Sequence, residues 1–243
     1  MASAPVADQL RLLDVQALDT RLAQLAHKRR SHPSLAALVE VTGRAEDLDR
    51  AKVDAETAVR DARRALLKAE TDVEQVRSRA ERDRKRLESG AESPRDLQAL
   101  AHELESLAKR QGDLEEVELE AMEAVETAQG ELDAITTQRA ALGEQINELE
   151  AERDTAFAEI DAERADVERQ RAAVAGGLDP GLVTLYDKVR ERTGGLGVLR
   201  LRGATTDPLQ ISLSLTERAE IDAAPAEEVV RSEDGYILVR VSD

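Results

Sequence analysis

The sequence contains no cysteine. Disulfide bonds, thiolate chemistry and cysteine-ligated zinc sites are therefore excluded. Aromatic residues make up 1% of the 243 residues, and they are Phe157, Tyr186 and Tyr236. A globular domain of this length ordinarily fills its core with more aromatic side chains. The composition therefore favours a core of Ala, Leu and Val between closely packed helices.

Two further absences concern location and partners. No run of about 18 apolar residues is present, and the opening MASAPVADQL lacks the basic-then-apolar pattern of a signal peptide. We therefore expect a cytoplasmic protein without a membrane segment. The formal net charge is -17. This acidic excess disfavours duplex DNA as a partner, because binding it requires many cations facing the phosphates.

Catalytic motifs are also missing. The sequence shows no phosphate-binding loop and no Ser-His-Asp order, and its three histidines (His27, His32 and His102) lack the spacing of metal ligands. We therefore expect no enzymatic activity, no bound metal and no cofactor.

Apolar residues recur at alternating spacings of three and four along two long segments. The first segment runs from Leu38 to Leu87 and the second from Leu97 to Val174. An average period of 3.5 residues keeps one seam facing a partner helix, which is typical of a left-handed coiled coil. A rod of this kind offers no concave pocket, so its function is expected to be contact with partners rather than catalysis.

Helix-breaking residues divide this ladder into helices at about 6–30, 34–89 and 94–175, with a tip at 90–94. Pro33 disfavours helix in the residue before it, Gly90 can end the second helix, and Pro94 suits the first position of the third. The short turn and matched lengths predict one antiparallel hairpin over residues 1–177, with a third helix about 120 Å long. The alternative to this intramolecular hairpin is a coiled coil formed between chains, as a dimer or a longer filament. With the hairpin, we expect the protein to be a monomer or a weak homodimer.

Residues 178–243 differ in kind and are predicted to form a small α+β module. Short apolar runs with turn residues between them indicate strands near 198–201, 211–215, 229–230 and 237–241, with helices near 180–192 and 216–223. At that size a single core is marginal without a metal or a docking partner. The predicted fold class is mainly α, with a long antiparallel coiled-coil hairpin followed by this module.

Three stretches of the chain are similar to a known bacterial family. They are RLESGAESPRDLQALAHELESL (86–107), LVTLYDKVRERTGGLGV (182–198) and PAEEVVRSEDGYILVR (225–240). The family combines a coiled-coil hairpin with a C-terminal four-cysteine zinc ribbon. The resemblance implies partners in transcription or secretion, because some relatives bind an alternative sigma factor of the sigma-54 type and flagellar or secretion components.

The chain departs from that family at the zinc ligands. Thr206 and Leu209 stand where the first Cys-x-x-Cys pair falls, Ser232 replaces the third ligand, and the fourth is deleted next to Gly235. The resemblance therefore implies a degenerate ribbon that has lost its zinc and is held by apolar strands, with Leu209 adding apolar burial. The alternative is that 203–215 is a loop without ribbon geometry.

A dense group of cations marks the hairpin tip, and it consists of Arg82, Arg84, Lys85, Arg86 and Arg95. Such a group can contact an acidic protein surface or RNA phosphates. The alternative is a solvated coiled-coil flank that pairs with Glu103 and Glu105. No aromatic residues interleave with the cations, so base stacking is not supported.

A second, weaker candidate surface lies where the hairpin meets the module, and it consists of Tyr186, Lys188, Arg190, Arg192, Arg200 and Arg202. The function predicted from these features is a non-enzymatic adaptor that binds protein partners through its tip and its C-terminal module, in transcription or regulation. The alternative is an RNA-binding protein that uses the same basic tip and the ribbon-like module.

Overall fold

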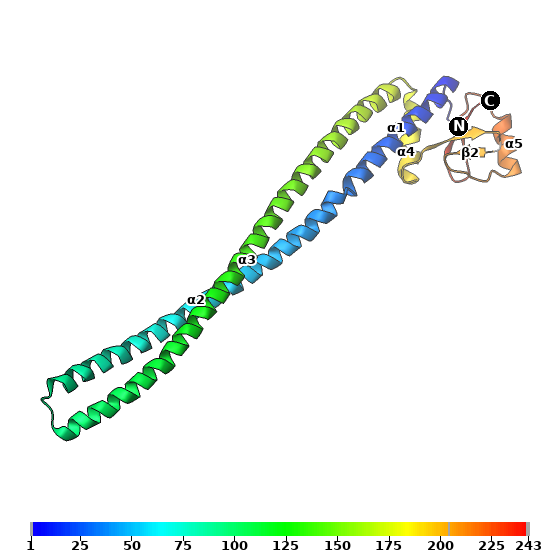
Figure 1. The fold of residues 1–243 in the computed structure, drawn as a ribbon. Helices are drawn as coiled ribbons and strands as arrows, with labels where there is room; N and C mark the ends of the chain where they lie inside the picture. Colours follow the sequence, from blue (N-terminus) through cyan, green and yellow to red (C-terminus); the bar gives the residue numbers. More distant parts are fainter. Residues whose placement is uncertain (1, 204, 242–243) are drawn as a thin grey trace. The chain divides into compact units, whose positions relative to one another are not determined.

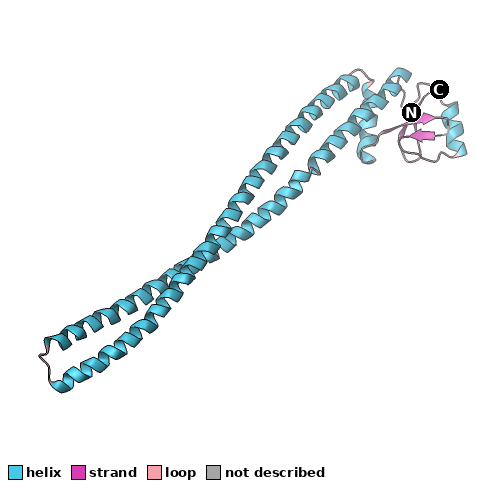
Figure 2. Cartoon of the chain, viewed as in Figure 1, coloured by secondary structure: helices cyan, strands magenta, loops and turns pink. Residues whose placement is uncertain are grey.

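A computed structural model describes residues 2–203 and 205–241. The chain forms two compact units. One contains residues 36–150, and the other combines residues 1–35 with 151–243. Helices make up the first unit, and strands occur only in the second (Figures 1 and 2).

The unit of residues 36–150 is an antiparallel helical hairpin. Its arms belong to α2 (Pro33–Ser89) and α3 (Pro94–Ala175). Side chains at the predicted seam spacing are buried between the arms, for example Val41, Ala45 and Leu142. Across the arms, Arg139 donates to Asp49 at 2.8 Å. The predicted long antiparallel coiled-coil hairpin is therefore confirmed.

The hairpin turns at Gly90, which has φ of 61° and so adopts the left-handed conformation that glycine tolerates best. Ser93 caps the next helix, because its hydroxyl accepts a hydrogen bond from the Asp96 amide at 3.3 Å. These local signals explain why the chain reverses within a few residues.

In the second unit, α1 (Val6–Arg30) packs along the last part of α3. Leu25 is buried against Ile160 and Val167, and Arg21 donates to Glu163 at 2.8 Å. The same spacing that builds the other unit therefore continues here between two different helical segments.

The rest of this unit is a small mixed sheet with two short helices. Its elements are α4 (Pro180–Arg192), β1 (Val198–Arg202), β2 (Thr205–Asp207), α5 (Leu215–Ala223), β3 (Val230–Arg231) and β4 (Ile237–Arg240). The strand order is β2-β1-β4-β3, with β1 and β4 parallel at the centre and the edge strands antiparallel to them.

Each face of the sheet covers a separate apolar core. On one face, Val198, Ile237 and Val239 pack with residues of α1 and α4, including Leu12 and Tyr186. On the other face, Leu199, Leu201 and Leu238 pack against Ile221 of α5. Helix α1 thus supplies the docking partner that so small a module needs.

The N-terminal residues before α1 also join this unit. Ser3 forms an antiparallel bridge with Glu228. The amide of Ala4 donates to the carbonyl of Glu227 at 2.9 Å, and the amide of Val229 donates to the carbonyl of Ala2 at 2.9 Å. Segments more than 220 positions apart in sequence are therefore paired.

The strand predicted at 211–215 is wrong. Residues 210–214 have no strand pairing, and α5 begins at Leu215, whose side chain is 89% exposed. Ser214 and Glu217 form a capping box, which starts the helix and ends the extended segment. Strand β2, by contrast, was not predicted, because its sequence Thr-Thr-Asp has no alternation of apolar and polar residues. The division of the chain at residue 177 stays a prediction.

Candidate functional site

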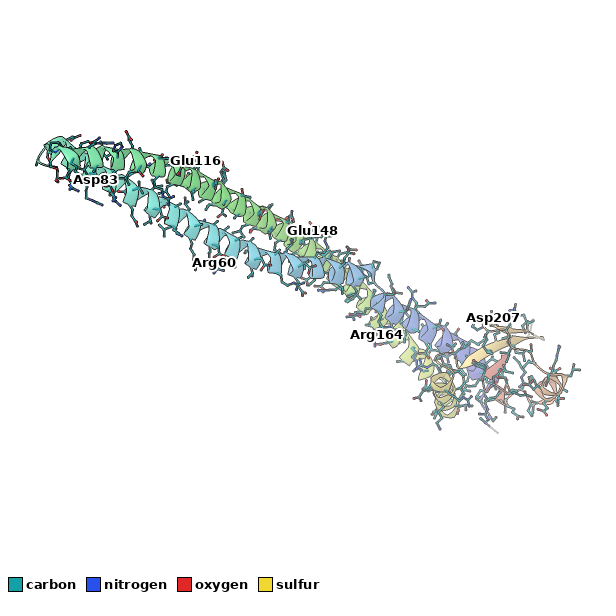
Figure 3. All side chains as sticks on the ribbon, turned by 90° about the horizontal axis from the view of Figure 1, so that it is seen from below. Arg60, Asp83, Glu116, Glu148, Arg164 and Asp207 are labelled. Carbon is teal, nitrogen blue, oxygen red and sulfur yellow. The ribbon has the colours of Figure 1, made fainter. Side chains whose placement is uncertain are left out.

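The tip candidates lie on the last turns of α2 and the first turn of α3. Arg82, Arg84, Lys85, Arg86 and Arg95 are all exposed. Figure 3 marks this end of the hairpin by the label Asp83. The candidate group therefore faces solvent, as a contact surface requires.

Two of these cations are already paired. Lys85 donates to Glu81 at 2.7 Å, and Arg86 donates to Glu92 at 3.0 Å. This hydrogen bond, donated by Lys85 to the Glu81 carboxylate, lowers the pKa of Glu81 and raises the pKa of Lys85. The pairing predicted with Glu103 is also present, although Arg79 makes it.

Arg82, Arg84 and Arg95 make no hydrogen bond or ion pair within residues 2–203 and 205–241. Their guanidinium groups are planar donors suited to carboxylates and phosphates. These three arginines, hereafter the tip arginines, are the part of the predicted group whose charge is not neutralised by a neighbouring acid within hydrogen-bond distance.

A buried carboxylate lies among these cations at the seam. Asp83 is 8% exposed, and its oxygens are 3.8 Å from Arg79 and 3.8 Å from Arg86. Its Oδ2 accepts no hydrogen bond from the described residues. Asp83 therefore draws two neighbouring arginines toward the seam.

The prediction that Tyr186 contributes to a partner-binding surface is wrong, because its side chain is fully buried. The Tyr186 hydroxyl donates to Oδ2 of Asp19 at 2.8 Å. Burial and this hydrogen bond raise the pKa of Tyr186, since both disfavour the phenolate. Tyr186 is a core residue.

Asp19 is the centre of a buried polar network that the sequence reading missed. Besides Tyr186, it receives Nε of Arg171 at 2.9 Å and lies 3.1 Å from Nη1 of Arg190. Arg171 also donates to Asp187 at 2.7 Å. The carboxylate thus joins α1, α3 and α4, and Arg190 is committed to this internal contact.

Gln16 extends the network to the sheet. Its Oε1 accepts from the amide of Gly197 at 2.6 Å, and its Nε2 donates to the carbonyl of Gly195 at 3.1 Å. The available signal was a polar residue within an apolar stripe, because Asp19 continues the spacing of Leu12 and Val15. Such a position predicts a buried polar contact, although it does not reveal the partners.

The remaining junction cations differ in their surroundings. Arg192 donates to the carbonyl of Gly235 at 2.9 Å. Arg192 is nevertheless exposed, as are Lys188, Arg200 and Arg202. A cationic surface on this unit therefore consists of fewer residues than the sequence suggested.

Two of the positions where the resemblance places zinc ligands, Thr206 and Ser232, carry hydroxyl groups with internal partners. Thr206 is buried, donates to the carbonyl of Leu209 at 2.7 Å and accepts from the amide of Ile211 at 2.9 Å. Ser232 is buried and accepts from the amide of Tyr236 at 3.1 Å. Each hydroxyl therefore stabilises its own turn.

The expectation that Leu209 adds apolar burial is wrong, because 41% of it is exposed. Its carbonyl, rather than its side chain, makes the contact with Thr206. Thr206 belongs to β2 and Ser232 follows β3, and these are the two edge strands of the sheet. In the part of the chain that the structure describes, no three His, Asp or Glu side chains gather as metal ligands.

The raised pKa of Tyr186 predicts a pH dependence of this unit. A free tyrosine titrates near pH 10. The stability that Tyr186 contributes is fully present below that pH and is lost as the pH rises toward its folded pKa. In a Tyr236→Phe variant, which leaves Tyr186 as the single tyrosine, phenolate absorbance should rise together with unfolding. A titration near pH 10 with the unit still folded would contradict the buried placement.

None of the described helices combines the length and the apolar composition that crossing a membrane demands.

An antiparallel coiled-coil hairpin followed in sequence by a small sheet module defines a class of coiled-coil hairpin proteins. The model of the CT398-like coiled coil hairpin domain matches residues 15–194. The chain belongs to this family, and its relatives indicate no enzymatic family.

Two mycobacterial proteins are similar over nearly the whole length. Rv2229c of Mycobacterium tuberculosis is 35% identical over 239 residues, which cover 98% of this chain and 97% of that protein. A solved Mycobacterium smegmatis structure is 32% identical with a TM-score of 0.85, and it covers 98% of this chain and 100% of its own. CT398 of Chlamydia trachomatis has a TM-score of 0.69 at 15% identity, covering 97% and 98%, so that likeness concerns the fold alone.

Proposed function

We propose that the chain is a non-enzymatic adaptor that holds a protein partner through the hairpin tip. The observation that carries this proposal is the group of tip arginines, which are exposed and form no ion pair with any described acidic residue, in a chain of net charge -17. Three such guanidinium groups at the ends of α2 and α3 that meet at the tip fit carboxylates on an acidic protein surface. A role in transcription or regulation belongs to the same proposal.

The C-terminal module provides the second part of this adaptor. We propose that it is a degenerate zinc ribbon in which hydroxyl groups of Thr206 and Ser232 hold the turns that thiolates would otherwise hold. Its exposed cations, Lys188, Arg200 and Arg202, offer a weaker contact surface. One tightly bound zinc ion per chain in elemental analysis would contradict the loss of the site.

The tip is tested by reversing its charge. Changing Arg82, Arg84 and Arg95 to Glu is expected to abolish capture of protein partners from the native lysate, with the larger difference from wild type at low salt, where screening is weakest. The helices should stay folded, because exposed substitutions change stability by less than about 0.5 kcal/mol. Pull-down at two salt concentrations, with circular dichroism on each variant, measures both effects.

The matched control changes Arg44, Arg60 and Arg64 to Glu. These exposed arginines lie on α2 away from the tip and alter the net charge equally. Equal capture by wild type and the tip variant at both salts would refute the proposal. Equal loss in the control variant would show that net charge, rather than the tip, governs binding.

RNA binding is the second candidate, because guanidinium groups also fit phosphates. Nuclease treatment before the pull-down separates the two. Protein capture that survives nuclease and depends on the tip arginines supports the adaptor. Capture that disappears with nuclease supports RNA.

A further inference from the structure

The middle of α3 carries charge of one sign only. Between Arg110 and Arg139 there are nine acidic residues and no lysine or arginine. Figure 3 marks this stretch by Glu116 on α3, with Arg60 on the neighbouring arm. Acidic charge by itself is ordinary on this chain. What distinguishes the stretch is the apolar surface within it.

Three apolar side chains are exposed along this stretch. Val117 is 49% exposed, Leu119 is 59% exposed and Met122 is 50% exposed. Leu119 and Met122 are three positions apart, so they are neighbours on the helix surface. Single exposed apolar residues such as Val39 and Val53 are normal, whereas Leu119 and Met122 line a common groove.

The groove lies between the two arms of the hairpin and has a volume of about 680 Å³. Leu66, Leu119, Met122 and Val125 provide its apolar lining. Its rim is acidic, with Glu123, Glu126 and Asp133. The one rim arginine, Arg63, is occupied, since it donates to Gln129 at 2.9 Å.

The seam beside this groove is only partly buried. Leu114 and Ala128 are buried, but the seam positions between them are not. Two of those positions hold Glu118 and Ala121, a charged residue and a small one. The seam is therefore less fully buried between Leu114 and Ala128 than at those two residues.

We infer that this groove binds a basic amphipathic helix of a partner protein. An amphipathic helix that binds in an apolar groove inserts apolar side chains at positions i, i+3, i+4 and i+7. Lysines or arginines on its flanks would face the acidic rim. Methionine suits such a groove because its flexible thioether adapts to different anchors. This surface differs from the tip in charge, composition and residues, so it goes beyond the function proposed above.

The test uses a synthetic 20-residue peptide of leucine and lysine in amphipathic order, with one tryptophan on its apolar face. The chain has no tryptophan, so a blue shift in emission reports burial of the peptide alone. A scrambled peptide of the same composition is the first control. We expect the amphipathic peptide to show the blue shift and at least tenfold tighter binding than the scrambled one.

Variants then locate the contact. Leu119→Gln with Met122→Gln is expected to weaken peptide binding at least tenfold. The matched control, Val39→Gln with Val53→Gln, removes two exposed apolar residues outside the groove and should change affinity by less than twofold. The tip variant should retain full peptide binding, so failure here and failure of the adaptor proposal are distinguishable.

Three outcomes would overturn the inference. The scrambled peptide could bind as tightly as the amphipathic one, the groove variant could bind as tightly as wild type, or the control variant could lose as much affinity as the groove variant. If sedimentation instead reveals a dimer that only the groove variant dissociates, and the peptide does not bind, the occupant is a second copy of this chain.

Discussion

Replacing Asp19 by alanine is expected to destabilise the unit of residues 1–35 and 151–243 by about 3–5 kcal/mol, because removing one partner leaves buried charges and polar groups uncompensated. The Asp19 side chain is 2% exposed and contacts Arg171 and Arg190. Tyr186 would also lose the acceptor of its hydroxyl.

Both tyrosines lie in this unit, and the chain has no tryptophan. Tyrosine fluorescence during urea denaturation therefore reports the unfolding of this unit. Asp14→Ala is the matched control, because Asp14 is an exposed carboxylate on the same helix. It should change stability by less than about 0.5 kcal/mol. Equal midpoints for the two variants would show that the Asp19 network contributes nothing.

The second large effect is expected from Gly197→Ala. A Cβ atom there would lie 2.7 Å from Cε2 and 2.8 Å from Cδ2 of Tyr186. The ring cannot move easily, because it is fully buried and its hydroxyl is held by Asp19. Overpacking of this kind costs about 1–3 kcal/mol. The same tyrosine signal in urea measures it.

Gly112→Ala is the opposite case among the glycines. Gly112 lies inside α3, and a Cβ atom there would meet nothing within 4 Å. Alanine should stabilise the helix there by about 0.5–1 kcal/mol.

If Gly197→Ala left the unit of residues 1–35 and 151–243 as stable as wild type, the close approach of β1 to the Tyr186 ring would be refuted.

The helices could be predicted because their signals are local. A 3.5-residue period sets the seam, and Pro33, Gly90 and Pro94 mark the ends of helices through backbone geometry alone. The capping role of Ser214 was likewise available from sequence. The same cap explains why the strand predicted at 211–215 does not form. Apolar and polar residues alternate there, but the capping box of Ser214 and Glu217 starts α5 at Leu215.

The interior of the small unit could not be predicted in the same way. Tyr186 and Asp19 are 167 positions apart, and no spacing rule relates residues on different elements at that distance. The hydroxyl of Tyr186 and the nearby Arg190 suggested a partner-binding surface in the sequence. In the structure both contact the buried carboxylate of Asp19. At the tip, the composition revealed the cations, but only side-chain geometry distinguished the tip arginines from those already paired.

The pairing of Ala4 with Glu227 has a consequence for the order in which the chain can fold during synthesis. The hairpin of residues 36–150 is a compact unit by itself, so it can fold as soon as its second arm leaves the ribosome. Residues 2–35 emerge first, yet their partners emerge last. Until then Leu12 and Val15, both fully buried in the finished fold, stay exposed to water and to chaperones.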